Sequence, residues 1–108
     1  MSTPSPSIET LSTPSLLLDR ARLARNVARM RERAIGLGIQ FRPHLKSAKS
    51  LDAAAFVLGT PPGPATVSTL KEAEMFGANG MTDLLYAVCI SPQKLAQVTR
   101  LRREGIDL

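Results

Sequence analysis

Residues 42–49 read Arg42-Pro43-His44-Leu45-Lys46-Ser47-Ala48-Lys49 and directly follow a short β-prone stretch at residues 39–41. Side chains alternate between the two faces of a strand, so Arg42, His44 and Lys46 share one face. In parallel sheets and barrels the chemistry lies at the carboxyl ends of the strands. We therefore predict that these three side chains lie at that edge. There, Lys46 is a candidate for a covalent link to a carbonyl compound.

A strand–helix unit recurs through the chain. Strands are predicted at residues 40–45, 65–68 and 83–88, with a further one starting at 106, and helical patterns lie between them. Such short connections favour parallel strands that are neighbours in chain order. The predicted fold class is α/β, namely the N-terminal portion of a (β/α)8 TIM-type barrel with about three βα units, preceded by a short extra strand at residues 15–18. A small open parallel sheet is the alternative.

The N-terminal part divides into two segments. Residues 1–13 are rich in Ser, Thr and Pro and lack the regions of a secretory signal, so we expect them to be mobile and residues 14–108 to form the partial barrel domain. The next segment, residues 20–37, is rich in arginine and carries apolar residues at helical spacing. This pattern predicts an amphipathic helix whose apolar stripe is buried. The stripe consists of Leu23, Val27, Met30, Ala34 and Leu37.

Composition excludes several classes of protein. The 108 residues are 44% hydrophobic and 21% charged, which is typical of a globular chain, and no apolar run is long enough to span a membrane. The net charge is +5, but the chain has no Trp and one Tyr, so nucleic-acid binding is not expected. The single cysteine, Cys89, excludes an internal disulfide. We expect it to be buried and the protein to be cytoplasmic.

Four stretches together carry a resemblance to a known family. They are residues 13–19, 42–49, 67–74 and 83–87, and they occur in the family's order. The chain resembles the N-terminal part of the pyridoxal-phosphate (PLP) enzymes of the alanine-racemase-like fold, also called fold type III. The D-threonine aldolase and D-serine dehydratase-like branch is the most similar. The resemblance implies that the barrel is of the PLP-binding kind.

The same resemblance assigns roles to the motif. It implies that Lys46 is catalytic and binds PLP covalently, and that His44 and Arg42 contribute to cofactor binding. It also implies small D-amino acid substrates, and homodimers among longer relatives. The family's phosphate-binding loops and any metal ligands lie in segments that the 108 residues do not include. We therefore predict no metal site here, and weak or absent PLP binding by this chain alone.

Two functions remain open from the sequence. The chain is either the N-terminal segment of a PLP-dependent enzyme, a lyase or racemase acting on D-amino acids, or a truncated, non-catalytic α/β remnant with a binding role or none. Some side chains also have two interpretations. His44 either handles the cofactor or is hydrogen-bonded at a strand end, and Tyr86 either faces the site or lies in the core. Thr69 and Glu72 are predicted to form a helix capping box.

Overall fold

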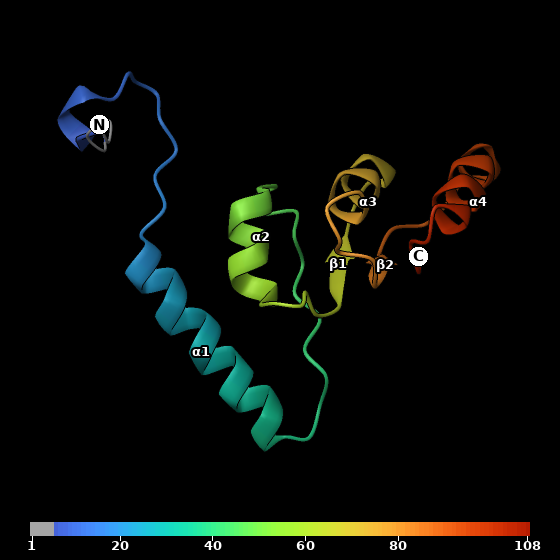
Figure 1. Cartoon of the computed structure of the whole chain (residues 1–108), viewed down its shortest axis with the longest axis horizontal. Coiled ribbons are helices and arrows are strands. Elements are labelled where there is room, and N and C mark those ends of the chain that lie inside the picture. The colour runs from blue at the N-terminus through green and yellow to red at the C-terminus, as the bar shows by residue number, and fades with distance from the viewer. Residues whose placement is uncertain (1–5) are drawn as a thin grey trace.

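The computed structural model describes residues 6–108, and Figure 1 shows how its helices and strands are arranged. The predicted N-terminal segment lies in part, at residues 1–5, outside the described residues. Within the remainder, Ser7 caps a single 3-10 turn. In chain order the elements are η1 (Ile8–Thr10), α1 (Arg20–Gly36), α2 (Leu51–Leu58), β1 (Ala65–Val67), α3 (Leu70–Gly77), β2 (Leu84–Tyr86), η2 (Pro92–Lys94) and α4 (Leu95–Arg103).

A small parallel sheet forms the centre of the structure. β1 pairs with β2 in parallel, with Thr66 opposite Leu85. Isolated parallel bridges extend the sheet on both sides, from His44 to Thr66 and from Asp83 to Asp107. Four chain segments therefore lie side by side in sequence order. This confirms the predicted α/β class and the predicted parallel order of the strands.

The outer strands are shorter than predicted. The segment at residues 40–45 forms one bridge instead of a regular strand; Pro43 has no N–H to donate to a ladder. The prediction of an extra strand at residues 15–18 is wrong for this structure. Among the described residues these have no ladder partner, and Leu16, Leu17 and Leu18 are 94%, 57% and 61% exposed. A strand without a neighbour cannot satisfy its backbone groups within a sheet.

The arginine-rich helix, α1, forms as predicted, and the Asp19 carboxylate accepts a hydrogen bond from the backbone N–H of Arg22 at its start. The prediction that its whole apolar stripe is buried is wrong. Ala34 is buried, whereas Met30 and Leu37 are 46% and 60% exposed. The reason is visible in Figure 1, where α1 runs along one side of the molecule, away from the strands, α3 and α4.

The core lies between the sheet and the helices α2, α3 and α4. α3 packs against both strands and against α4. The buried cluster comprises Leu45, Ala54, Leu58, Ala65, Val67, Ala73, Phe76, Met81, Leu84, Leu101 and Ile106. The radius of gyration is 16.6 Å, whereas a compact domain of this length has about 13 Å. The difference reflects the outlying positions of residues 6–19 and of α1 (Figure 1).

Two further observations concern the surface. Cys89 is exposed, so the prediction of a buried cysteine is wrong. β2 ends at Tyr86, and the loop that carries Cys89 beyond it has no helix or strand over it, as its exposed residues show. Within residues 6–108, no helix combines the length and the apolar character needed to cross a membrane.

Candidate functional site

The motif at residues 42–49 runs from the edge of the sheet into a loop. The backbone N–H of Leu45 donates to the Thr66 carbonyl at 2.9 Å, which fixes the end of this segment beside β1. The Leu45 side chain turns into the core and is 6% exposed. Lys46, the next residue, is exposed just beyond the paired part of the sheet, level with the carboxyl end of β1. The predicted accessible position of Lys46 is therefore found.

His44 is partly buried and lies two residues before Lys46 in the chain. Its Nδ1 accepts a hydrogen bond of 3.3 Å from the backbone N–H of Lys46. An accepting Nδ1 puts the proton of a neutral imidazole on Nε2. His44 is thus hydrogen-bonded at the end of the bridged segment, and its second ring nitrogen is left for a further partner.

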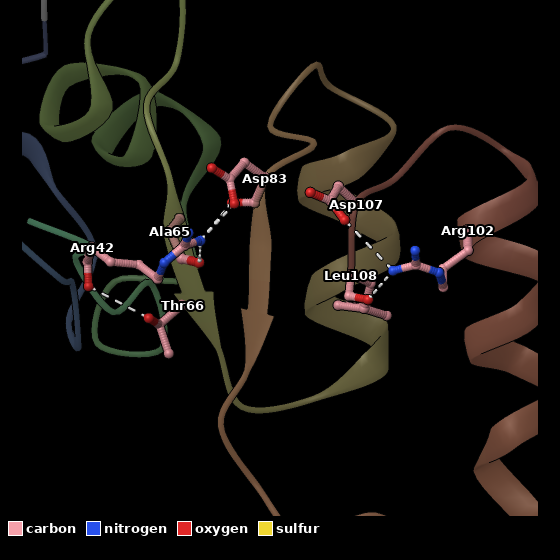
Figure 2. Close-up of polar contacts among 7 residues, drawn as sticks. All are labelled: Arg42, Ala65, Thr66, Asp83, Arg102, Asp107 and Leu108. Atoms are coloured by element: carbon pink, nitrogen blue, oxygen red, sulfur yellow. Dashed lines mark hydrogen bonds and ion pairs between the residues drawn. The ribbon is translucent and has the colours of Figure 1, made fainter. Parts of the chain in front are cut away.

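Arg42 lies at the opposite end of the strands, so the prediction that it shares the carboxyl edge with Lys46 is wrong. Figure 2 shows its guanidinium between the amino ends of β1 and β2. One nitrogen, Nη1, donates to the Ala65 and Asp83 carbonyls at 3.2 Å each, and to the Asp83 carboxylate at 2.8 Å. Arg42 and Lys46 are four residues apart, and an extended chain rises by about 3.3 Å per residue, so the two residues lie at opposite ends of the paired region.

An ion pair joins the motif loop to α3. Lys49 Nζ lies 3.3 Å from Glu72 Oε1, and the Glu72 side chain is only 5% exposed. Glu72 also accepts hydrogen bonds from the Ser68 backbone N–H at 2.7 Å and from the Ser68 hydroxyl at 3.1 Å. Thr69 Oγ1 accepts from the Glu72 backbone N–H at 3.0 Å, as a capping box requires. The carboxylate reaches Ser68, one residue before the cap, instead of the cap itself.

This arrangement keeps Glu72 ionised. Burial acts to raise the pKa of its carboxyl, but the hydrogen bonds from Ser68 and Lys49 and the charge of Lys49 outweigh it, so the pKa lies below its usual value of 4.5. The Glu72 carboxylate is therefore a fixed negative charge beside the loop that carries Lys46 and Lys49.

Tyr86 ends β2 at the same edge of the sheet and is half-buried. Lys94 Nζ donates to its hydroxyl at 3.2 Å and lies 5.8 Å from the centre of its ring. The Tyr86 hydroxyl thus has a hydrogen-bond partner on the segment that leads into α4. The sequence pattern does not predict the pairing of Lys49 with Glu72 or of Arg42 with Asp83. Each pair joins residues that only the parallel register brings together.

A cavity of about 280 Å³ opens beside the ion pair, lined by Lys49, Thr69, Lys71, Glu72 and Met75. Within residues 6–108, no group of three His, Cys, Asp or Glu side chains is placed to hold a metal ion. The chemically distinctive groups of this edge are therefore amines, one imidazole and one buried carboxylate.

Comparison with known proteins finds curated sequences that are similar to this chain. No family model matches the chain. It is 48% identical over 99 residues to D-threo-3-hydroxyaspartate dehydratase of Delftia sp.. The match covers 92% of this chain and 26% of the relative. The chain is 33% identical over 100 residues to D-serine dehydratase of Dictyostelium discoideum, covering 87% of this chain and 25% of the relative. The chain thus spans about a quarter of the length of these curated relatives.

Solved structures agree with the sequence comparison. A mutant of D-threo-3-hydroxyaspartate dehydratase in its metal-free form superimposes with a TM-score of 0.91 at 46% identity, covering 96% of this chain and 27% of that one. An alanine-racemase-like protein from Idiomarina loihiensis gives a TM-score of 0.87 at 48% identity, covering 92% of this chain and 26% of that one. The chain is therefore similar, over about a quarter of their length, to D-threo-3-hydroxyaspartate dehydratase and D-serine dehydratase, and its structure resembles part of an alanine-racemase-like protein.

Proposed function

We propose that this chain is the lysine-bearing part of a PLP-dependent dehydratase of small D-amino acids, with Lys46 as the residue that binds the cofactor covalently. One observation carries the proposal. Lys46 is exposed at the carboxyl edge of a parallel sheet in a chain 48% identical to a D-amino acid dehydratase. In this class of fold, that edge is where catalytic groups lie.

The residues present suit an aldehyde cofactor at this point. Lys46 offers a primary amine that makes no ion pair within residues 6–108, and His44 beside it keeps Nε2 available for a hydrogen bond. When bound, PLP supplies an electron sink for the substrate's α-carbon, and the protein supplies orientation and electrostatics. We assign Lys46 the catalytic attachment and His44 a supporting contact. The sequence-based role of Arg42 in cofactor binding we restrict to an indirect one, since its guanidinium is engaged with Ala65 and Asp83.

Elimination is the reaction we propose. The relatives described above carry the name dehydratase, and their named substrates, D-threo-3-hydroxyaspartate and D-serine, both have a hydroxyl on the β-carbon. This favours loss of water over the aldol cleavage expected for a D-threonine aldolase. We also propose a cytoplasmic location, because the one cysteine is free. Homodimer formation and the division at residue 13 stay predictions.

Binding by the 108 residues alone is proposed to be weak, because a lysine supplies the covalent link but tight binding also needs phosphate contacts. The test is a titration of the chain with PLP, followed by visible absorbance, in the wild type, Lys46→Ala and Lys94→Ala. We expect the saturable change to be lost in Lys46→Ala and kept in Lys94→Ala. Equal spectra in all three would favour the alternative, a non-catalytic remnant.

A further inference from the structure

Lys46 and Lys49 are two primary amines in one loop, and both are chemically able to react with an aldehyde. Their surroundings differ. Lys49 Nζ is 3.3 Å from Glu72 Oε1, whereas the Lys46 amine makes no ion pair within the part of the chain that the structure describes. The Lys49 side chain is 60% exposed. Burial therefore does not protect Lys49 from reaction, and any difference between the two amines must come from Glu72.

Glu72 has reason to hold Lys49 firmly. Its side chain is 5% exposed, and Lys49 is its cationic partner. Only the Glu72 side of this pair is buried, so loss of the Lys49 charge would leave the buried carboxylate with the Ser68 hydrogen bonds and no cation beside it, which costs more than losing a pair exposed on both sides. The hydrogen bonds from Ser68 hold the carboxylate in place at 2.7 Å and 3.1 Å, so it cannot follow a departing lysine into solvent.

The backbone conformation of Lys49 is unusual at the point where its side chain contacts Glu72. Its φ is +49°, in the left-handed region that residues with a Cβ seldom adopt. Its N–H donates to the Leu45 carbonyl at 3.1 Å, which closes the loop around Lys46. The loop thus directs the Lys49 side chain toward α3 and leaves Lys46 outside the contact.

We propose that Glu72 withholds Lys49 from amine chemistry and so directs an aldehyde to Lys46. Reaction of a lysine with an aldehyde needs the uncharged amine. The nitrogen bonds to the aldehyde carbon, the carbonyl oxygen leaves as water, and the ammonium proton goes to solvent. At Lys49 the amine must first give up the proton whose charge pairs with Glu72, whereas at Lys46 the same loss breaks no ion pair within the described residues. The choice of Lys46 as acceptor rests on the proposed function, whereas the protection of Lys49 does not.

The experiment is reductive labelling of the whole chain with PLP and borohydride, followed by peptide mapping. The measured quantity is the labelling of Lys49 relative to Lys71, an exposed lysine. In Glu72→Gln we expect this ratio to rise about fivefold, which corresponds to about 1 kcal/mol. The amide oxygen of glutamine can still accept from Ser68, so the cap is kept. Glu74→Gln is the matched control, since Glu74 lies on the same helix but pairs with Arg100.

A ratio that stays unchanged in Glu72→Gln, or that rises equally in Glu74→Gln, overturns the inference. Labelling of the wild type alone, with and without urea, tests the inference even if a variant fails to fold. In the native wild type Lys49 is expected to label several times less than Lys71, and in concentrated urea the two should label alike. Equal labelling in the native state also overturns it. The proposed function fails separately, if Lys46 shows no preference over Lys71 in the native wild type.

Discussion

The Arg42 guanidinium and the Asp83 carboxylate meet at 2.8 Å, across the amino end of the strand that lies between their own segments. The same guanidinium nitrogen also donates to the Ala65 and Asp83 carbonyls. Figure 2 shows that Asp83 in turn lies near the last segment, where Arg102 contacts Asp107. The amino ends of the strands are therefore held together by polar contacts, opposite the edge that carries Lys46.

This relationship predicts that Arg42 stabilises the fold and does not react with the cofactor. Arg42→Gln should lower the free energy of unfolding by about 1 kcal/mol, a modest value because both side chains are partly exposed. Urea denaturation measures this change. PLP labelling of Lys46 under native conditions should stay as in the wild type. A loss of that labelling in a variant that is still folded would return Arg42 to the cofactor site.

The lowered pKa of Glu72 predicts how the stability of the chain depends on pH. Its pKa is lower in the folded chain than its usual value of 4.5, so the folded state binds fewer protons than the unfolded state. The stabilisation is therefore fully present above 4.5 and is lost as the pH falls through the lower folded value. Urea midpoints measured from neutral pH down to about pH 3 should show a decline that is shallower in Glu72→Gln. Equal slopes in the two proteins would contradict this.

Gly77 is predicted to be essential for packing. A Cβ built on it would overlap the Ile106 side chain, with Cγ1 at 2.7 Å, and Ile106 belongs to the core. Gly77→Ala should destabilise the chain by about 1 to 3 kcal/mol. Gly36→Ala is the control, since Gly36 is also helical but has open space around it, and it should be neutral or stabilising by up to about 1 kcal/mol. Thermal melting compares them; similar melting temperatures would contradict the packing argument.

The exposed leucines at residues 16–18 predict self-association. Consecutive exposed apolar side chains are unusual in a soluble monomer, and the isolated chain should be marginally stable and associate as its concentration rises. Replacing Leu16 and Leu18 by Ser should shift sedimentation toward the monomer. Ile8→Ser, at a residue 74% exposed on a separate turn, should not. A wild type that sediments as a monomer at high concentration would refute the prediction.

Sequence reasoning reached the parallel order of the segments because turn signals and helix caps mark each βα unit. Asp19 and Ser50, for example, are residue types that favour helix caps, and they cap α1 and α2 in the structure. The exposed position of Lys46 was also predicted correctly, because side chains alternate along an extended segment and the preceding Leu45 is buried. Sequence reasoning missed that Arg42 lies at the other end of the strands. The direction of a long side chain depends on carbonyls of other segments, which are adjacent only in the folded chain.

Two further wrong predictions, the strand at residues 15–18 and the buried stripe of α1, have a common physical cause. Residues 15–18 have strand propensity, but a strand needs a neighbour, and none of the described residues provides one. The stripe of α1 has helical periodicity, but Met30 and Leu37 are buried only if another element covers them. Periodicity indicates which face would be buried, and the presence of a covering element decides whether it is.

The central claim, that Lys46 binds the cofactor, is tested most directly by reducing the PLP-treated chain with borohydride. Mass spectrometry then measures the label on each of the four lysines, Lys46, Lys49, Lys71 and Lys94. The proposed function predicts that Lys46 carries the largest share of the label, that this share disappears in Lys46→Ala, and that it is not taken over by Lys71 or Lys94. Label spread evenly over the four lysines in the native chain would contradict Lys46 as the cofactor-binding residue.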